Sequence, residues 1–394
     1  MNMQIIARGW LMYSLTSSAM DLAWVTLSFM LPTVAFSLWG GVVADRMPKR
    51  RIIALAQTLN CIATVVMGYI IFSDRVDFWD FIWFGFFNGT ILALSMPARQ
   101  AFAPELIPQR LMFTAMALNT TSWNLSRILG PALAGFLIAW AAAGDTASTY
   151  GVGIVYFVIA SLYFISIITI VMVRKPGLVK QLARQKSPLT DMADAFRYVW
   201  ASPPVFGLIL LSIVPFLFGM PINTLLPAFN EDILGGGPDD LGLLMSAMGL
   251  GAIVGSLLLA SVNDFKNRAA WLIATCVGWG VFTSAFGFSQ TLVLSSVMIA
   301  VIGFLSSWNM SLNRGMLQLQ VDDHMRGRIM SVDMMSHGLM PIGVIPISII
   351  AEQYSVATAI VVSGIAFVVL VVLLSVVAQS VRHVDDNLQP MSGG

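Results

Sequence analysis

From Leu22 to Phe72 the chain reads LAWVTLSFMLPTVAFSLWGGVVADRMPKRRIIALAQTLNCIATVVMGYIIF. This stretch holds two apolar runs, Leu22 to Ala44 and Ile52 to Phe72, which are joined by a short basic gap. A helix rises about 1.5 Å per residue, so a run of about 20 apolar residues crosses the roughly 30 Å hydrocarbon core of a bilayer with its backbone hydrogen bonds intact. Each run therefore predicts a membrane-spanning helix.

The same pattern predicts twelve spans, six in each half of the chain. The other ten cover approximately 1–16, 78–96, 114–140, 151–173, 206–229, 241–262, 269–288, 292–312, 329–351 and 356–377. Composition agrees, since 57% of the residues are hydrophobic and 10% are charged, whereas soluble domains hold about 25% charged residues. We therefore predict an all-α membrane protein.

Basic residues gather on one side of the predicted spans. All 21 Lys and Arg residues except Arg8, Arg75, Arg127 and Arg314 lie in segments on one face. By the positive-inside rule this face is cytoplasmic, so both termini are expected inside. The net charge is only +1, which argues against nucleic acid as a partner.

One long polar stretch divides the chain. The predicted organisation is an N-terminal bundle over 1–173, a cytoplasmic linker over 174–204, a C-terminal bundle over 205–379 and a cytoplasmic tail over 380–394. Within the linker, a predicted N-cap at Ser187, Pro188 and a helical spacing of apolar residues predict an amphipathic helix on the membrane surface; the alternative is a regulatory docking helix. The first span is short for a crossing. We expect it to be truncated, and the alternative is a short helix in a thinned bilayer.

The two halves carry related sequences. Residues 41–49 match residues 260–268, and Arg99 after the fourth span corresponds to Arg314 after the tenth. Duplicated halves of this kind are typical of transporters, with the substrate site between the halves near the middle of the membrane.

Three motifs carry a family resemblance. The segment Gly41-Val-Val-Ala-Asp45-Arg46-Met-Pro-Lys49-Arg50-Arg51 resembles the signature loop of the major facilitator superfamily, with Pro48 where many members have Gly. The fifth span resembles the antiporter motif of that superfamily, a ladder of small residues that includes Gly130, Pro131 and Gly135. The phrase Arg326-Gly-Arg328-Ile-Met-Ser331 is similar to the bacterial branch that includes the enterobactin exporter.

The resemblance implies two six-helix bundles, alternating access and export. It also implies a conformational gate at the cytoplasmic face, formed by Gly41, Asp45, Arg46, Arg50 and Arg326. Asp45 would pair with nearby arginines and with the positive end of a neighbouring helix in one state. The alternative is that these cations only set the topology.

Charges within the predicted spans are few, and each is costly in a membrane. Asp333 and His337 are four residues apart, on one face of a predicted helix. A carboxylate beside an imidazole can take up and release H⁺, so we predict this pair as the proton-coupling site. The alternative places Asp333 near the helix start, bonded to Ser331 or Arg328, with His337 in a structural bond. Arg314 is predicted as an interfacial or gate residue.

Four further residues are predicted to line a central cavity: Arg8, Asn88, Asn119 and Arg127. An amide that faced lipid would lack a partner, so asparagines in spans are expected to face the interior. Interhelical hydrogen bonds are the alternative role. The 24 Met residues would supply an adaptable apolar lining.

Enzymatic and metal chemistry find little support. Cys61 and Cys276 have no spaced Cys or His partners, which argues against a metal or disulfide site. No phosphate-binding Gly-x-x-x-x-Gly-Lys-Ser or Thr motif occurs, so we expect no enzyme and no cofactor, and transport driven by an ion gradient, most simply of H⁺.

The resulting hypothesis is a secondary transporter of the bacterial cytoplasmic (inner) membrane that exports small amphipathic molecules, of drug or siderophore type, in exchange for protons. Its expected partners are a small-molecule substrate and membrane lipids, and we expect a monomer. The alternatives are metabolite uptake, a lipid flippase or a membrane scaffold that transports nothing.

Overall fold

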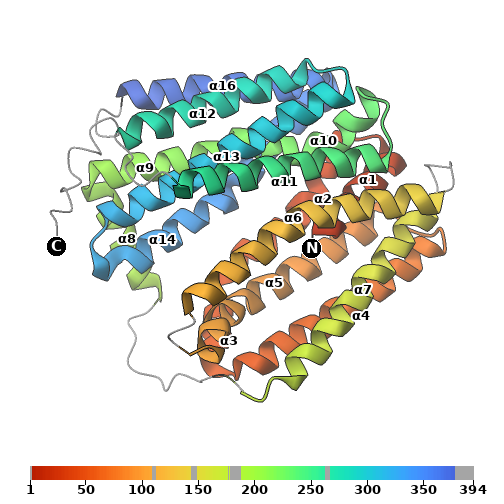
Figure 1. The fold of residues 1–394 in the computed structure, drawn as a ribbon, viewed down its shortest axis with the longest axis horizontal. Coiled ribbons are helices and arrows are strands. Elements are labelled where there is room, and N and C mark those ends of the chain that lie inside the picture. Colours follow the sequence, from red (N-terminus) through yellow and green to blue (C-terminus); the bar gives the residue numbers. More distant parts are fainter. Residues whose placement is uncertain are drawn as a thin grey trace. The chain divides into compact units, whose positions relative to one another are not determined.

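The computed structural model describes residues 2–108, 112–142, 149–175, 177, 188–261 and 267–377. Throughout these residues the regular structure is helical, without a strand (Figure 1). The chain forms two compact units. Unit 1 comprises Met1–Gln185 with Gly235–Ser246, and unit 2 comprises Lys186–Leu234 with Ala247–Gly394.

Unit 1 is built from seven helices and the beginning of an eighth. They are α1 (Asn2–Thr16), α2 (Ala19–Ala35), α3 (Ser37–Arg46), α4 (Lys49–Phe72), α5 (Phe78–Leu106), α6 (Met112–Ala142), α7 (Thr149–Met172) and the first part of α11 (Pro238–Ser261). Helices α4 and α7 lie side by side along their lengths (Figure 1), and α2 packs against α5.

Unit 2 holds the remaining elements. They are α8 (Pro188–Ala201), α9 (Pro203–Val214), the π-helix η2 (Pro215–Gly219), α10 (Pro221–Asp232), the rest of α11, α12 (Arg268–Gly287), α13 (Leu292–Gln320), α14 (Asp323–Met335), the 3₁₀-helix η3 (Ser336–Leu339), α15 (Met340–Gln353) and α16 (Val356–Val377). Helix α12 packs against both α13 and α16.

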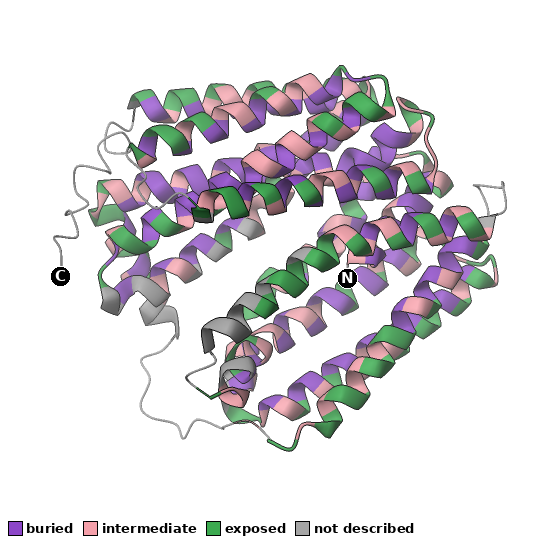
Figure 2. Cartoon of the chain, in the orientation of Figure 1, coloured by how far each residue is buried: buried purple, intermediate pink, exposed green. Residues whose placement is uncertain are grey.

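Within the described residues, nine helical segments are long and apolar enough to cross a membrane. Their outward faces are apolar, as at Phe164 on α7 and Leu373 on α16, and Figure 2 shows exposed positions along the whole of α4 and α7. Such large exposed apolar surfaces are unfavourable in water and match the lipid environment of a membrane-spanning helix. The chain is a multi-pass membrane protein.

Three predicted spans have no such helix. The first, α1, holds 15 residues. The second is divided at Phe36 into α2 and α3, four residues after Pro32, which has no backbone N–H to donate. The eleventh is divided into α14, η3 and α15, so the prediction of one continuous helix over 329–351 is wrong.

A prolyl break also changes the predicted seventh span. The 30-residue apolar segment Pro203–Asp232 contains η2 at Pro215–Gly219, where the N–H of Met220 donates to the carbonyl of Pro215 at 2.8 Å, an i to i−5 bond of the π type. Pro215 begins this turn and Pro221 follows it, and neither can donate a backbone hydrogen bond. π-helical turns of this kind occur frequently at functional sites.

The predicted linker helix is present as α8, which starts at Pro188. Ala195 and Val199 are buried while Phe196 is exposed, and α8 packs against α14 and α9. The buried face of α8 therefore contacts protein, and both its place on the membrane surface and a regulatory role stay predictions. Ser187 and the tail 380–394 lie outside the described residues.

Candidate functional site

A buried carboxylate marks the candidate site, in unit 2. Asp333 on α14 is 1% exposed. Its Oδ1 accepts a hydrogen bond of 2.5 Å from the hydroxyl of Ser212 on α9, and its Oδ2 lies 3.4 Å from Nε of Arg314 on α13. Three helices thus place a hydroxyl and a guanidinium on one carboxylate, which compensates part of the cost of burying its charge.

This carboxylate is deep in the apolar part of the chain. Ser212 is nine residues beyond Pro203, the start of a 30-residue apolar segment, which corresponds to roughly 13 Å at helical rise. Arg314 is six residues before the end of α13, or roughly 9 Å. Charged groups at such depth are rare and usually belong to substrate or ion pathways.

Two amides continue the polar surface along α13. Asn309 and Asn313 are one helical turn apart and buried, at 1% and 3% exposure. The Asn309 amide donates to the carbonyl of Leu272 at 3.2 Å and contacts the Cys276 sulfur at 2.9 Å, and the Asn313 amide donates to the carbonyl of Leu208 at 3.3 Å. Among the described residues, Oδ1 of Asn313 has no hydrogen-bond partner.

A pocket lies beside this cluster. It is lined by Ser212, Pro215, Phe216, Asn309, Met310, Asn313 and Arg314. Ser212 and Arg314 both contact Asp333, so the pocket and the carboxylate share two residues. The side chain of Arg314 is 43% exposed. The pocket has a volume of about 10 Å³, room for about one water molecule, and apolar, amide and cationic groups meet at it.

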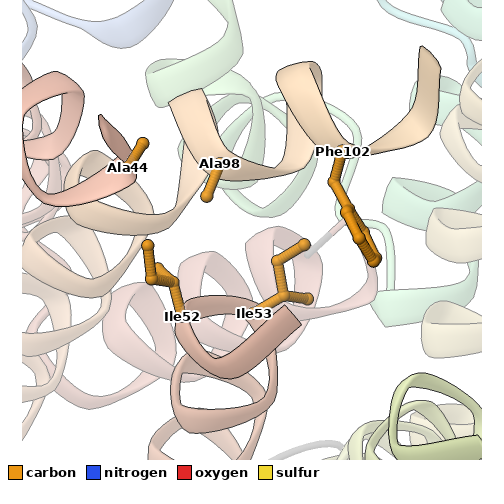
Figure 3. Close-up of a cluster of buried hydrophobic side chains, with 5 residues drawn as sticks. All are labelled: Ala44, Ile52, Ile53, Ala98 and Phe102. Carbon is orange, nitrogen blue, oxygen red and sulfur yellow. The ribbon is translucent and has the colours of Figure 1, made fainter. Parts of the chain in front are cut away.

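A second cluster of charge lies in unit 1, close in the chain to four of the five predicted gate residues, whereas the fifth, Arg326, belongs to unit 2. Lys49, at the start of α4, forms an ion pair of 2.7 Å with Glu105 near the end of α5. Beneath it, Ala44, Ile52, Ile53, Ala98 and Phe102 form a buried apolar cluster, and Figure 3 shows the isoleucines pointing toward α5. This packing fixes the ends of α3, α4 and α5 together.

The predicted antiporter motif has a packing role in unit 1. Gly130 lies against Asn2 and Met3 of α1, and Gly135 lies against Pro238 and Gly242 of α11, where the ideal Cβ position of Gly135 is 3.0 Å from the Cα of Gly242. Small residues allow such close helix approach. Helix α6 continues unbroken through Pro131.

A family profile described as transmembrane secretion effector matches residues 1–392. The chain belongs to this family, a branch of the major facilitator superfamily. Members of the superfamily are transporters rather than enzymes.

Curated relatives of this secretion-effector chain are exporters and carriers. It is 23% identical to the staphyloferrin A transporter of Staphylococcus aureus (strain NCTC 8325 / PS 47), over 92% of this chain and 88% of the relative. It is 25% identical to the multidrug efflux pump Tap of Mycolicibacterium fortuitum, over 83% and 80%, and 26% identical to the enterobactin exporter EntS of Escherichia coli O1:K1 / APEC, over 74% and 67%.

Solved structures share the fold of the secretion-effector chain. A bacterial homologue of the human lysosomal transporter Spinster, in an inward-facing and unoccupied conformation, aligns with a TM-score of 0.70 at 14% identity, covering 98% of this chain and 95% of that one. The nucleoside transporter NupG aligns with a TM-score of 0.69 at 14% identity, covering 96% of each. Both likenesses concern the fold alone.

The predicted proton pair is only partly described. Asp333 contacts Ser212 and Arg314, and Arg328 pairs with Asp194 of α8. The side chain of Ser331, an alternative partner of Asp333, lies outside the described residues. Helix α14 ends at Met335, so the premise that Asp333 and His337 share one α-helical face is wrong. The side chain of His337 lies outside the described residues, as do those of Asp45 and Arg326.

The other predicted residues are spread over unit 1. Arg8 is half-buried, with its guanidinium 5.9 Å from the centre of the Phe29 ring. Asn88 is buried and donates to the carbonyl of Phe84, one turn earlier in α5. Asn119 and Arg127 are exposed on α6.

The remaining gate residues differ in their surroundings. Arg46 is exposed at the end of α3, and Gly41 has open space where a Cβ would lie. Arg50 donates to the carbonyl of Val171 at 2.7 Å, which joins the start of α4 to the end of α7.

Sequence reasoning missed Ser212, Asn309 and Asn313. The two asparagines carried a usable signal, since amides four residues apart in an apolar helix share a face and need partners. Ser212 carried none, because serines occur throughout the spans and its role depends on a residue far away in the chain.

Proposed function

We propose that this protein is a proton-coupled exporter of small amphipathic molecules in the cytoplasmic membrane of a bacterium, working by alternating access. The relatives named as transporters or exporters of siderophores and as a drug efflux pump support the direction and the class of cargo. The proposed topology has twelve crossings in two six-helix bundles, with both termini in the cytoplasm.

The twelve crossings comprise the nine long apolar segments together with α1, the pair α2 and α3, and the series α14, η3 and α15. Transporters use interrupted helices near their binding sites, because a broken helix exposes backbone groups only where it lines protein or a cavity. The interruption at Ser336–Leu339 begins three residues after Asp333 and supports this assignment.

The burial of Asp333 between Ser212 and Arg314 carries the proposal of proton coupling. As a carboxylate, Asp333 balances the charge of Arg314. Protonation removes that balance and leaves the charge of the guanidinium uncompensated, which disfavours a cationic or hydrogen-bond-donating cargo group beside the residues that Arg314 adjoins.

Proton and cargo are thereby linked through one side chain. A cationic or hydrogen-bond-donating cargo group beside Asp333 stabilises its carboxylate form, so cargo binding favours proton release and protonation favours cargo release, as exchange requires. Thermodynamic linkage makes this coupling reciprocal, and a coupling of about 1–3 kcal/mol is sufficient to bias two states.

The test is transport by the purified protein in liposomes with an imposed pH gradient, with ethidium and enterobactin as separate probes. We expect a gradient directed against the cargo flux to drive accumulation, and an uncoupler to abolish it. Asp333→Asn should remove the dependence on the gradient, whereas Asp239→Asn, which changes an exposed carboxylate of α11, should keep it.

The outcomes separate the alternatives. Accumulation that persists after the pH gradient has collapsed would refute proton coupling. Probe movement in the same direction as the protons would indicate uptake, and transbilayer movement of labelled phospholipid without probe transport would indicate a flippase.

A further inference from the structure

A second pocket lies in unit 1, at the ends of α4 and α7 that carry most of the cations. It is lined by Arg50, Arg51, Ala54 and Val171, with a volume of about 350 Å³. This volume falls within the range of about 300–1,000 Å³ that is common for small-ligand sites. The pocket belongs to a different unit from the Asp333 cluster.

Positive charge is concentrated around this pocket. The first turn of α4 holds Lys49, Arg50 and Arg51, where the helix dipole already contributes partial positive charge. Lys49 is paired with Glu105. Arg50 is held over the pocket by its hydrogen bond to the carbonyl of Val171, and Arg51 is exposed.

The chain adds further cations where α7 ends. Arg174 and Lys175 are exposed directly after this helix, and Nζ of Lys175 lies 3.4 Å from the carbonyl oxygen of Glu105. Cations at both helix ends therefore create a positive potential at the pocket, and an anion in the pocket would relieve it.

Apolar side chains flank the pocket on the outer faces of the same helices. Leu55 on α4 is 55% exposed and Met172 on α7 is 74% exposed. Leu55 lies one helical turn beyond Arg51, and Met172 follows Val171 in the chain. A ligand that fits this arrangement has an anionic head and apolar chains.

We propose that this pocket binds the phosphate headgroup of an anionic phospholipid, with Arg50 and Arg51 on the phosphate and the acyl chains along α4 and α7. Basic pockets between membrane helices, on the face expected to be cytoplasmic, are suited to such headgroups. The lipid would bridge two helices that pack along their lengths and so stabilise unit 1.

The test uses the full-length protein in nanodiscs of phosphatidylcholine alone or with added phosphatidylglycerol or cardiolipin. Thermal unfolding and mass spectrometry of retained lipid are the two measurements. For the wild type we expect a higher Tm with anionic lipid and retention of anionic lipid through mild delipidation.

The double variant Arg50→Gln with Arg51→Gln should lose the Tm gain and weaken lipid retention by roughly 30-fold, the effect of two cations at an anionic membrane surface. The matched control, Arg75→Gln with Arg197→Gln, removes the same charge from exposed positions elsewhere and should keep both. An equal loss of Tm gain and of lipid retention in the control would refute the proposed lipid site.

Two further arms complete the test. Inorganic phosphate without anionic lipid should leave the Tm unchanged. If phosphate alone gave the full Tm gain, the ligand of the pocket would be a free anion and not a lipid. If the double variant fails to fold, Ala54→Phe, which fills the pocket and keeps the charges, takes its place. Normal lipid retention in that folded variant would refute the proposal.

Discussion

Ser212 and Asp333 lie 121 positions apart in the chain, and the hydroxyl of the serine donates a hydrogen bond of 2.5 Å to the carboxylate of the aspartate. This bond joins α9 to α14 within unit 2. A donor of this kind offsets part of the cost of removing the carboxylate from water.

The first prediction concerns Ser212→Ala. Without the hydroxyl, the buried carboxylate of Asp333 loses a hydrogen bond, so the free energy of unfolding should fall. A hydrogen bond to a charged group contributes about 1.5–3 kcal/mol. The measurement is thermal unfolding of the variant and the wild type in the same lipid.

Ser306→Ala is the matched control, since Ser306 is a buried serine of α13 that donates to the carbonyl of Gly303 in its own helix. A neutral hydrogen bond contributes only about 0.5–1.5 kcal/mol, so Ser306→Ala should lower the free energy of unfolding by less than Ser212→Ala does. Equal losses in the two variants would show that the hydroxyl of Ser212 does not stabilise the buried carboxylate.

A second prediction concerns the pair of Arg314 and Asp333. Removing one partner of a fully buried ion pair costs about 3–5 kcal/mol, because the other charge is left uncompensated. Arg314 is 43% exposed, so Arg314→Gln should cost less than this. The double variant Arg314→Gln with Asp333→Asn should lose about 1 kcal/mol less free energy of unfolding than the two single variants lose together.

Thermal unfolding of the four proteins in one lipid measures this coupling. As a control, Arg197→Gln removes an exposed cation from α8. Its effect on the free energy of unfolding should add to that of Asp333→Asn. Additivity of the Arg314 and Asp333 changes would mean that their contact contributes no net stability.

The long apolar helices could be predicted from the sequence, and the broken ones could not. The predicted spans 151–173 and 356–377 match α7 and α16 within a few residues, because hydropathy alone limits an uninterrupted crossing. The breaks at Phe36 and at Ser336–Leu339 depend on how prolines and neighbouring helices share backbone donors, which hydropathy does not report.

The candidate site was predictable only in part. A carboxylate in an apolar segment identified Asp333, because burial of charge is costly whatever the fold. Its partners come from α9 and α13, and no local spacing connects Ser212 to it. Helical spacing instead suggested His337, and the 3₁₀ turn at that point removes the basis for that pairing.

A third prediction concerns the docking of α8 on α14. The carboxylate of Asp194 lies 3.6 Å from the guanidinium of Arg328, with both side chains about one-third exposed. Exposed pairs of this kind contribute about 0.2–1 kcal/mol. Asp194→Asn should therefore raise hydrogen exchange of the α8 amides by up to roughly fivefold.

Hydrogen exchange followed by mass spectrometry of the α8 peptide gives the rates. Arg197→Gln changes an exposed charge on the same helix and should leave them unaltered. Equal rates in Asp194→Asn and the wild type would show that packing of Ala195 and Val199 alone holds the helix.

A fourth prediction concerns pH and Tyr198, also on α8. Burial raises the pKa of its hydroxyl above the ordinary value of 10.0; a hydrogen bond with the backbone of Asp322 opposes this rise, and the charge of the Asp322 carboxylate adds to it. The protonated hydroxyl donates to that carboxylate at 3.2 Å.

Since the docked state holds this proton more tightly, its contribution to docking is complete below about pH 10 and is lost as the pH rises through the raised value. The measurement is tyrosinate absorbance, taken as the difference between the wild type and Tyr198→Phe. A midpoint of that difference below about pH 10 would contradict the raised pKa.

The last prediction separates two glycines by their surroundings. A Cβ on Gly135 would collide with the carbonyl oxygen of Pro238 and lie 3.0 Å from the Cα of Gly242, so Gly135→Ala must push α6 away from α11. Gly315 on α13 has open space at the same position, and alanine there should stabilise the helix by about 0.5–1 kcal/mol. We therefore expect a lower Tm for Gly135→Ala and a higher Tm for Gly315→Ala, measured in the same lipid. Equal shifts for the two variants would mean that helix propensity, and not the close approach of α6 to α11, sets the requirement for glycine at position 135.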